Sequence, residues 1–124
     1  MTWLLIHSYL TLLWVDLRLR LTGLNRLHQW VKRQMVRSPK GCGGSVETLC
    51  RAVELASVFY FKRVMCLQRS AATTAILRRH GWKAEMVIGA QLSPFKSHAW
   101  VEVDHAVVND KPYIVDIYQV LDRC

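Results

Sequence analysis

The sequence of 124 residues has a common length for one domain, and it can bury a core without disulfide bonds. Apolar residues make up 52% of the chain, which excludes intrinsic disorder and, with five Trp, predicts more exposed apolar surface than a monomer usually carries. We therefore expect a partner protein. The formal net charge is +8, but the Lys and Arg residues are spread along the chain instead of forming one stripe with aromatic residues. An acidic peptide or protein accounts for this charge, and we expect no nucleic acid.

The four cysteines, Cys42, Cys50, Cys66 and Cys124, follow neither the spacing of a zinc site nor that of a CxxC redox motif. The apolar opening of the chain has no basic region ahead of it and no small-residue cleavage site, as a secretory signal would have. We expect free thiols, a cytoplasmic protein, and no metal or organic cofactor.

Residues 2–20 predict a helix that is buried or faces a partner, because the apolar run is shorter than the ~20 residues of a membrane span. The alternative is a helix on a membrane surface, flanked by Arg18 and Arg20. A second helical pattern follows Gly23, and residues 37–44 form the one Pro/Gly-rich stretch. We interpret 1–44 as an N-terminal helical segment and Gly-rich loop, part of the same domain as a 45–124 core.

Two further helices are predicted in the first part of that core. Ser45 can cap a helix whose apolar positions fall on one face, at Val46, Leu49, Cys50, Val53, Ala56 and Tyr60. Cys66 opens the next helix, which ends at His80-Gly81, where Gly can take the left-handed conformation of a helix end.

From Lys83 onward the pattern changes to a period of two, which predicts strands. These are AEMVIGAQ, SHAWVEV, AVVND and YIVDIYQV, separated by Ser93-Pro94, by an Asp104-His105 turn and by Lys111-Pro112. Helices followed by a meander of about four strands predict an α+β fold, with the N-terminal helices packed on one face of an antiparallel sheet.

Cys66 and His98 are the candidate catalytic residues. The first turn of a helix lowers the pKa of a thiol, because unpaired N–H groups and the helix dipole favour the thiolate. Alternation on the strand HAWVEV puts His98, Trp100 and Glu102 on one face and a plainly apolar set on the other. A base beside an aromatic ring suits proton exchange with a thiol.

A third group should orient the imidazole, and Asp104, Asp110 and Asp116 are the acidic candidates. Asp104 belongs to the turn, and Asp116 can be a solvated residue of the last strand. Asp110 lies on the strand next to that of His98, but a strict two-residue turn would point it away. A three-residue turn or a bulge would correct the facing.

The order of motifs in this half of the chain is specific. It combines a Cys-Leu-x-Arg-Ser helix start at Cys66, the helix end ILRRHG, the strand AEMVIGA, and HAWVEVD from His98 to Asp104. This order resembles the transglutaminase-like leader peptidases of bacterial lasso peptide biosynthesis, a branch of RiPP maturation. The resemblance runs from about Ser45 to the C-terminus; the first forty residues match only in being apolar and helical.

The resemblance implies a transglutaminase-like, papain-like fold with a triad in which Cys66 attacks, His98 accepts and returns the proton, and Asp110 orients His98. It also implies a cysteine peptidase that cleaves the leader from a lasso peptide precursor, before a separate asparagine-synthetase-like cyclase closes the macrolactam. No winged β-rich module precedes residue 45, so we expect the stand-alone form, which acts with a separate leader-recognition protein.

The chain departs from the family at one turn, which is typically Asp-Gly and is Asp104-His105 here. His adopts such a turn less readily than Gly, which weakens the assignment of Asp110. Two other functions remain open: a transglutaminase-like acyl transferase with the same triad, and a non-enzymatic basic adaptor in which Cys66 is only a core residue.

Overall fold

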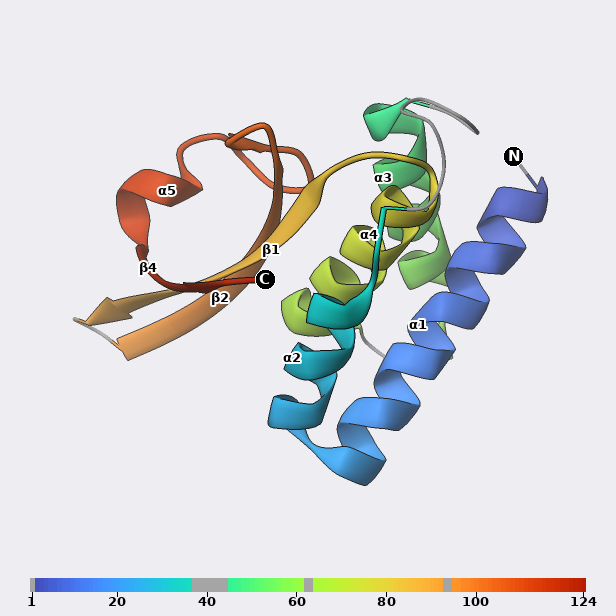
Figure 1. Ribbon diagram of the computed structural model, residues 1–124, viewed down its shortest axis with the longest axis horizontal. Coiled ribbons are helices and arrows are strands. Elements are labelled where there is room, and N and C mark those ends of the chain that lie inside the picture. The colour runs from blue at the N-terminus through green and yellow to red at the C-terminus, as the bar shows by residue number, and fades with distance from the viewer. Residues whose placement is uncertain (1, 37–44, 62–63, 93–94) are drawn as a thin grey trace.

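The computed structural model describes residues 2–36, 45–61, 64–92 and 95–124, and it divides into a helical half and a sheet (Figure 1). The helices are α1 (Thr2–Thr22), α2 (Leu24–Arg33), α3 (Val46–Phe59) and α4 (Cys66–Arg79). The elements that follow are β1 (Ala84–Leu92), β2 (Phe95–Val103), β3 (Ala106–Val107), α5 (Ile114–Ile117) and β4 (Gln119–Arg123). The predicted α+β architecture, with helices packed on an antiparallel sheet, is confirmed.

The helix ends follow from local chemistry. Ser45 caps α3, because its Oγ accepts a hydrogen bond from the Thr48 N–H at 3.2 Å. α4 begins at Cys66 and ends before Gly81, whose φ of 91° is the left-handed conformation expected there. These three boundaries agree with the sequence prediction.

The sheet has the strand order β3-β2-β1-β4, and all of its neighbouring strands are antiparallel. β1 and β2 form a long hairpin that pairs Gly89 with His98. β4 returns to the far side of β1, so the sheet is not a simple meander. The central position of β1 and β2 gives the His98 strand a neighbour on each side.

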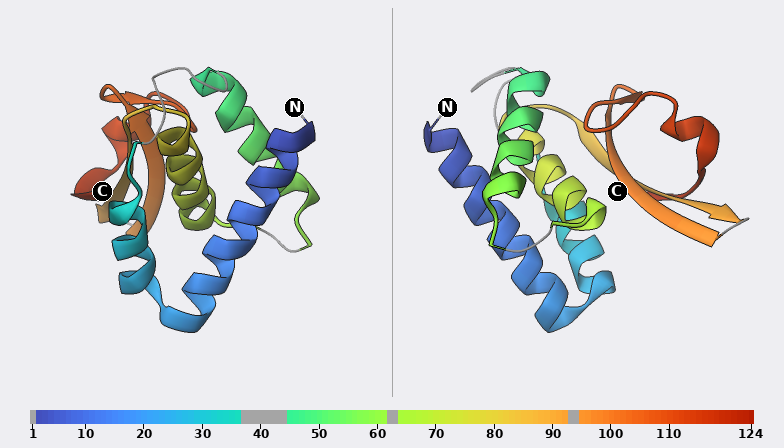
Figure 2. Two further views of the ribbon diagram at one scale, coloured as in Figure 1. Left: turned by 45° about the vertical axis from the view of Figure 1, so that its right-hand side comes forward. Right: turned by 180° about the vertical axis from the view of Figure 1, so that it is seen from behind.

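The two faces of the sheet are covered differently (Figure 2). The helices cover one face, and their core includes Leu12, Leu27 and Leu77 together with Val101 of β2. On the other face the chain after β3 folds back, and a small second cluster forms from Val87, Trp100 and Ile114. Both faces of β2 are therefore buried over most of its length.

Two predicted strands are shorter than expected. The segment YIVDIYQV does not form one strand, because Ile114–Ile117 makes a helical turn and only Gln119–Arg123 joins the sheet. A helical turn sets Ile114 and Tyr118 close together, so that both pack against Trp100. In a strand the two residues would share a face but lie about 13 Å apart. The predicted strand AVVND keeps only Ala106 and Val107.

The Asp104-His105 turn contains the two residues that the sequence assigned to it. Both have positive φ, 53° and 66°, and Val103 pairs with Ala106, which defines a two-residue hairpin turn. The three-residue turn or bulge expected as a correction is wrong. The predicted loop at 37–44, with Cys42, and the break at Ser93-Pro94 lie outside the described residues.

The first helix has one buried and one exposed side. The buried side, which packs on α3 and α4, consists of Leu4, Ser8, Thr11, Leu12, Val15 and Asp16. The exposed side carries Trp3, Ile6, Leu10, Leu13, Trp14, Leu17 and Leu21. Within the described part of the chain, no helix is both long enough and apolar enough to cross a membrane.

Candidate active site

Cys66 is the first residue of α4, which packs directly against β2. The thiol is half-buried. The residue before it, Met65, donates its backbone N–H to Oε1 of Gln68 at 2.9 Å, and Gln68 in turn donates to Oδ1 of Asp16 on α1 at 3.1 Å. These bonds fix the backbone immediately before the thiol, at the N-terminus of α4.

The other described cysteines are poor nucleophiles. Burial, with the charges of Glu47 and Glu54, raises the pKa of the Cys50 thiol to about 12. Burial raises the pKa of Cys124 to about 11. Both thiols therefore stay protonated at neutral pH, which leaves Cys66 as the candidate among the cysteines that the structure describes.

His98 of β2 and Asp110 are in direct contact. The imidazole Nε2 lies 2.6 Å from Oδ2 of Asp110, and the two side chains are 21% and 22% exposed. With its Nε2 proton donated to the carboxylate, the neutral ring presents Nδ1 as the nitrogen that can accept a proton from a thiol. The contact is the one that the predicted Cys-His-Asp triad requires between its base and its orienting group.

The carboxyl of Asp110 is held in its ionised form. Burial alone would raise its pKa, but hydrogen bonds from His98 and from the backbone N–H of Lys111, with the charges of His98 and Arg69, outweigh burial and lower the pKa below the usual value. An ionised carboxylate accepts a hydrogen bond from the ring N–H, and it stabilises an imidazolium when the ring takes up a second proton.

The other acidic candidates lie elsewhere. Asp104 is in the hairpin turn at the opposite end of β2 from His98, and Asp116 is exposed on α5. The structure therefore brings Asp110, and neither of these two, to His98.

Aromatic rings hold the imidazole of His98 from one side. Its ring stacks on Tyr118 at a centroid distance of 5.3 Å and on Trp100 at 6.2 Å. Trp100 is fully buried and donates its indole N–H to Glu102 at 2.9 Å. The indole is therefore part of the packing of the sheet and offers no exposed surface to a ligand.

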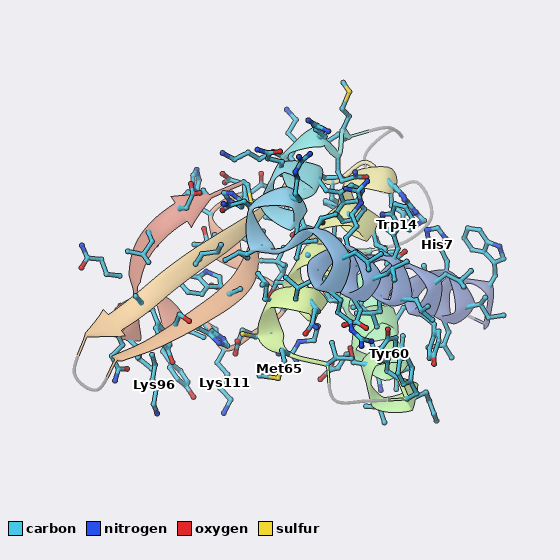
Figure 3. The ribbon with its side chains drawn as sticks, turned by 90° about the horizontal axis from the view of Figure 1, so that it is seen from below. His7, Trp14, Tyr60, Met65, Lys96 and Lys111 are labelled. Carbon is cyan, nitrogen blue, oxygen red and sulfur yellow. The ribbon has the colours of Figure 1, made fainter. Side chains whose placement is uncertain are left out.

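The neighbours of the three candidate residues lie along one edge of the molecule in the view from below (Figure 3). Met65 precedes Cys66, Lys96 lies two residues before His98, and Lys111 follows Asp110. The start of α4, the start of β2 and the segment after β3 thus reach the same side.

A polar cavity of about 270 Å³ borders Asp110. It lies between α3, α4 and the segment after β3, and its lining consists of Cys50, Glu54, Arg69, Thr73, Asn109, Asp110 and Lys111. Arg69 and Thr73 follow Cys66 at helical spacing, so they share its side of α4. Among the described residues, no three His, Cys, Asp or Glu side chains are grouped as metal ligands.

Sequence patterns missed three residues of this site: Tyr118, Asn109 and Arg69. Tyr118 was assigned to a strand by alternation, although its spacing from Ile114 fits a helical turn equally well. Asn109 and Arg69 carried no signal of their own beyond their positions next to Asp110 and in the Cys-Leu-x-Arg-Ser motif.

The chain belongs to the transglutaminase-like superfamily, whose family model matches residues 11–123. The match includes Cys66, His98 and Asp110. It also includes most of α1, whereas the resemblance seen in the sequence began only at about Ser45.

The chain is also similar to an individual protein of known name. The chain is 43% identical over 56 residues to the microcin J25-processing protein McjB of Escherichia coli. The alignment covers 45% of this chain and 27% of that protein, so the match spans about a quarter of the relative's length. No solved structure matches the chain.

Proposed function

We propose that this protein is a cysteine peptidase that cleaves the leader from a lasso peptide precursor. The observation that carries the proposal is the 2.6 Å contact between His98 and Asp110 on the strand against which the Cys66 helix packs. Membership of the transglutaminase-like superfamily and the similarity to a microcin-processing protein support the same reading.

In the proposed reaction, Nδ1 of His98 takes the proton of Cys66, and the thiolate attacks the carbonyl carbon of the last leader residue. Backbone N–H groups at the start of α4 stabilise the oxyanion. The C–N bond then breaks, the imidazolium protonates the departing amine of the core peptide, and the leader stays on Cys66 as a thioester. Water, deprotonated by His98, hydrolyses the thioester and releases the leader carboxylate. The freed core amine is the group that a separate cyclase would join into the macrolactam.

The exposed side of α1, with its many apolar side chains, supports the proposal of a separate leader-recognition protein. Leu5, Ile6, Tyr9 and Leu10 form, with Ala56 and Phe59 of α3, an apolar groove of about 240 Å³. Exposed apolar side chains in such numbers are typical of a surface that a partner covers. We place this partner on α1 and the precursor peptide at the edge that holds the triad, in a cytoplasmic complex.

Mass spectrometry of the precursor tests the function directly. The precursor is incubated with its recognition protein and either the wild-type chain, Cys66→Ala, or the control Cys50→Ala, which removes a thiol that stays protonated. We expect a free leader carboxylate with the wild type and the control, and intact precursor with Cys66→Ala. Equal cleavage by all three would remove Cys66 from the mechanism, and an amide adduct on the leader would identify an acyl transferase.

A second assay tests the partner. We expect leader release to accelerate when the recognition protein is added, and Leu10→Glu on α1 to abolish this gain without changing the slow rate of the chain alone. Full activity of the chain by itself, with no gain from the partner, would contradict the proposal that this peptidase acts with a separate recognition protein.

A further inference from the structure

The position of Asp110 does not follow from the sheet. β3 is paired only through Ala106 and Val107, and one more backbone bond, from the Val108 N–H to the Val101 carbonyl at 2.9 Å, continues the ladder. Beyond Val108 the strand ends. A continued ladder with the observed two-residue turn would set Asp110 opposite Ala99 and face it away from His98.

Asn109 replaces the missing ladder bond with its side chain. Its Oδ1 accepts the backbone N–H of Val101 at 2.7 Å, which releases the Asn109 backbone from strand geometry. The chain can then turn so that the next residue, Asp110, meets Nε2 of His98. The side chain of Asn109 thus explains why Asp110 faces His98, although the hairpin has neither a bulge nor a longer turn.

Ser70 connects this bond to the nucleophile helix. Nδ2 of Asn109 donates to Oγ of Ser70 at 3.2 Å, and Ser70 donates to the carbonyl of Ala99 at 3.1 Å. Ser70 is fully buried and lies one helical turn after Cys66. Ser70 therefore contacts a direct neighbour of two of the proposed triad residues: Ala99, which follows His98, and Asn109, which precedes Asp110.

We propose that Ser70 and Asn109 are positioning residues that hold the three segments of the triad in register. The proposal rests on the proposed peptidase function for its kinetic consequences, but the geometry of the His98–Asp110 pair can be measured without substrate. Neither residue touches the reacting atoms. Asn109 determines the direction in which Asp110 points, and Ser70 links Asn109 to α4 by a hydrogen bond. The network joins a buried hydroxyl to a half-buried amide, and its hydrogen bonds favour one arrangement of the three segments.

The substrate-free test is proton NMR of the His98 ring. A strong hydrogen bond to Asp110 moves the Nε2 proton to low field, and the signal is assigned by its absence in Asp110→Ala. We expect Asn109→Ala and Ser70→Ala to remove or shift this signal while circular dichroism shows a folded chain. The control is Thr74→Val on the same helix. It removes a buried hydroxyl that bonds to none of the described residues, and it should leave the signal in place.

The kinetic test is a double-mutant cycle with the precursor as substrate. We expect Asn109→Ala to lower kcat roughly tenfold to 100-fold with little change in KM, because misplacing a catalytic group affects the chemical step. In an Asp110→Ala background the same substitution should change kcat by less than about twofold. An equal loss in both backgrounds, or an unchanged His98 signal in both Asn109→Ala and Ser70→Ala, would overturn the proposal. Absence of Cys66-dependent cleavage would instead defeat the peptidase function, and the NMR signal would still decide the positioning role.

Discussion

The ring of Trp100 occupies the space where Gly89 would carry a side chain. A β-carbon on Gly89 would lie 2.7 Å and 2.8 Å from two carbons of the indole and 3.0 Å from Cβ of Tyr118. Because Trp100 is fully buried and bonded to Glu102, the indole cannot move aside. The absence of a side chain at Gly89 thus lets both rings that stack on His98 reach their positions.

Gly89→Ala should therefore destabilise the fold by about 1–3 kcal/mol through overpacking. Urea unfolding of the variant measures this loss. In a Trp100→Phe background, where the clashing indole carbons are gone, the same change should cost clearly less. An equal cost in both backgrounds would show that the indole is not what excludes a side chain.

Asp110→Asn should reduce leader cleavage by on the order of 10²-fold, because the neutral amide cannot stabilise the imidazolium. The substitution also removes a pH-dependent part of the stability. The folded pKa of Asp110 is lowered, so its carboxylate stabilises the fold above the ordinary pKa of about 3.9, and this contribution is lost as pH falls through the lowered value.

Urea unfolding at a series of pH values compares the two proteins. At pH 7 we expect the free energy of unfolding of the wild type to exceed that of Asp110→Asn by on the order of 1 kcal/mol. The difference should shrink as the pH is lowered. A difference that grows as pH falls would have the wrong sign for a lowered pKa.

Asp16→Ala should weaken the contact between α1 and the start of α4. Asp16 is buried and accepts hydrogen bonds from the Tyr60 hydroxyl at 3.3 Å and from Gln68 at 3.1 Å, so its loss leaves buried donors unpaired and should cost about 1–3 kcal/mol. Burial, followed by the charge and hydrogen bond of Asp16, raises the pKa of Tyr60 to about 12.

In Asp16→Ala the pKa of Tyr60 should fall toward its ordinary value of 10.0 without reaching it, since burial remains. Ultraviolet titration of the phenol measures the change, and Asp116→Ala on the exposed α5 is the control. An unchanged titration would mean that Asp16 does not act on the phenol.

Two adjacent threonines of α4 should respond in opposite directions. Thr73 and Thr74 are both buried, but Thr73 donates to the Arg69 carbonyl at 2.7 Å, whereas the hydroxyl of Thr74 has no hydrogen-bond partner among the residues that the structure describes. Replacing Thr74 by Val removes an unsatisfied group at constant shape and should stabilise the fold by about 1 kcal/mol. Thermal unfolding should show a higher Tm for Thr74→Val and a lower one for Thr73→Val; a lower Tm for both would indicate a bound water or partner at Thr74.

The parts of the fold that sequence predicts well depend on local chemistry. The cap at Ser45, the start of α4 at Cys66 and the glycine end at Gly81 are each decided by a few neighbouring residues. The position of His98 on one face of β2 follows from alternation alone. These features need no knowledge of the rest of the chain.

The remainder depends on contacts between distant residues. The facing of Asp110 depends on Asn109 bonding to a backbone N–H eight residues earlier and to Ser70 on another helix. α5 forms because Ile114 and Tyr118 have Trp100 to cover, and the same residues alternate well enough to resemble a strand. A pattern read along the chain contains neither partner, so it could explain the facing of Asp110 only by a longer turn or a bulge, and it predicted a strand where α5 forms.

The link from Asp16 through Gln68 to Met65 limits how this protein can be divided or fused. Because α1 supplies a carboxylate to the residues that lead into Cys66, a fragment that starts at residue 45 would leave Gln68 and Tyr60 without it and would uncover the apolar side of α3. We therefore expect such a fragment to fold less stably than the whole chain. A domain fused to this protein should leave the contact between α1 and the start of α4 intact.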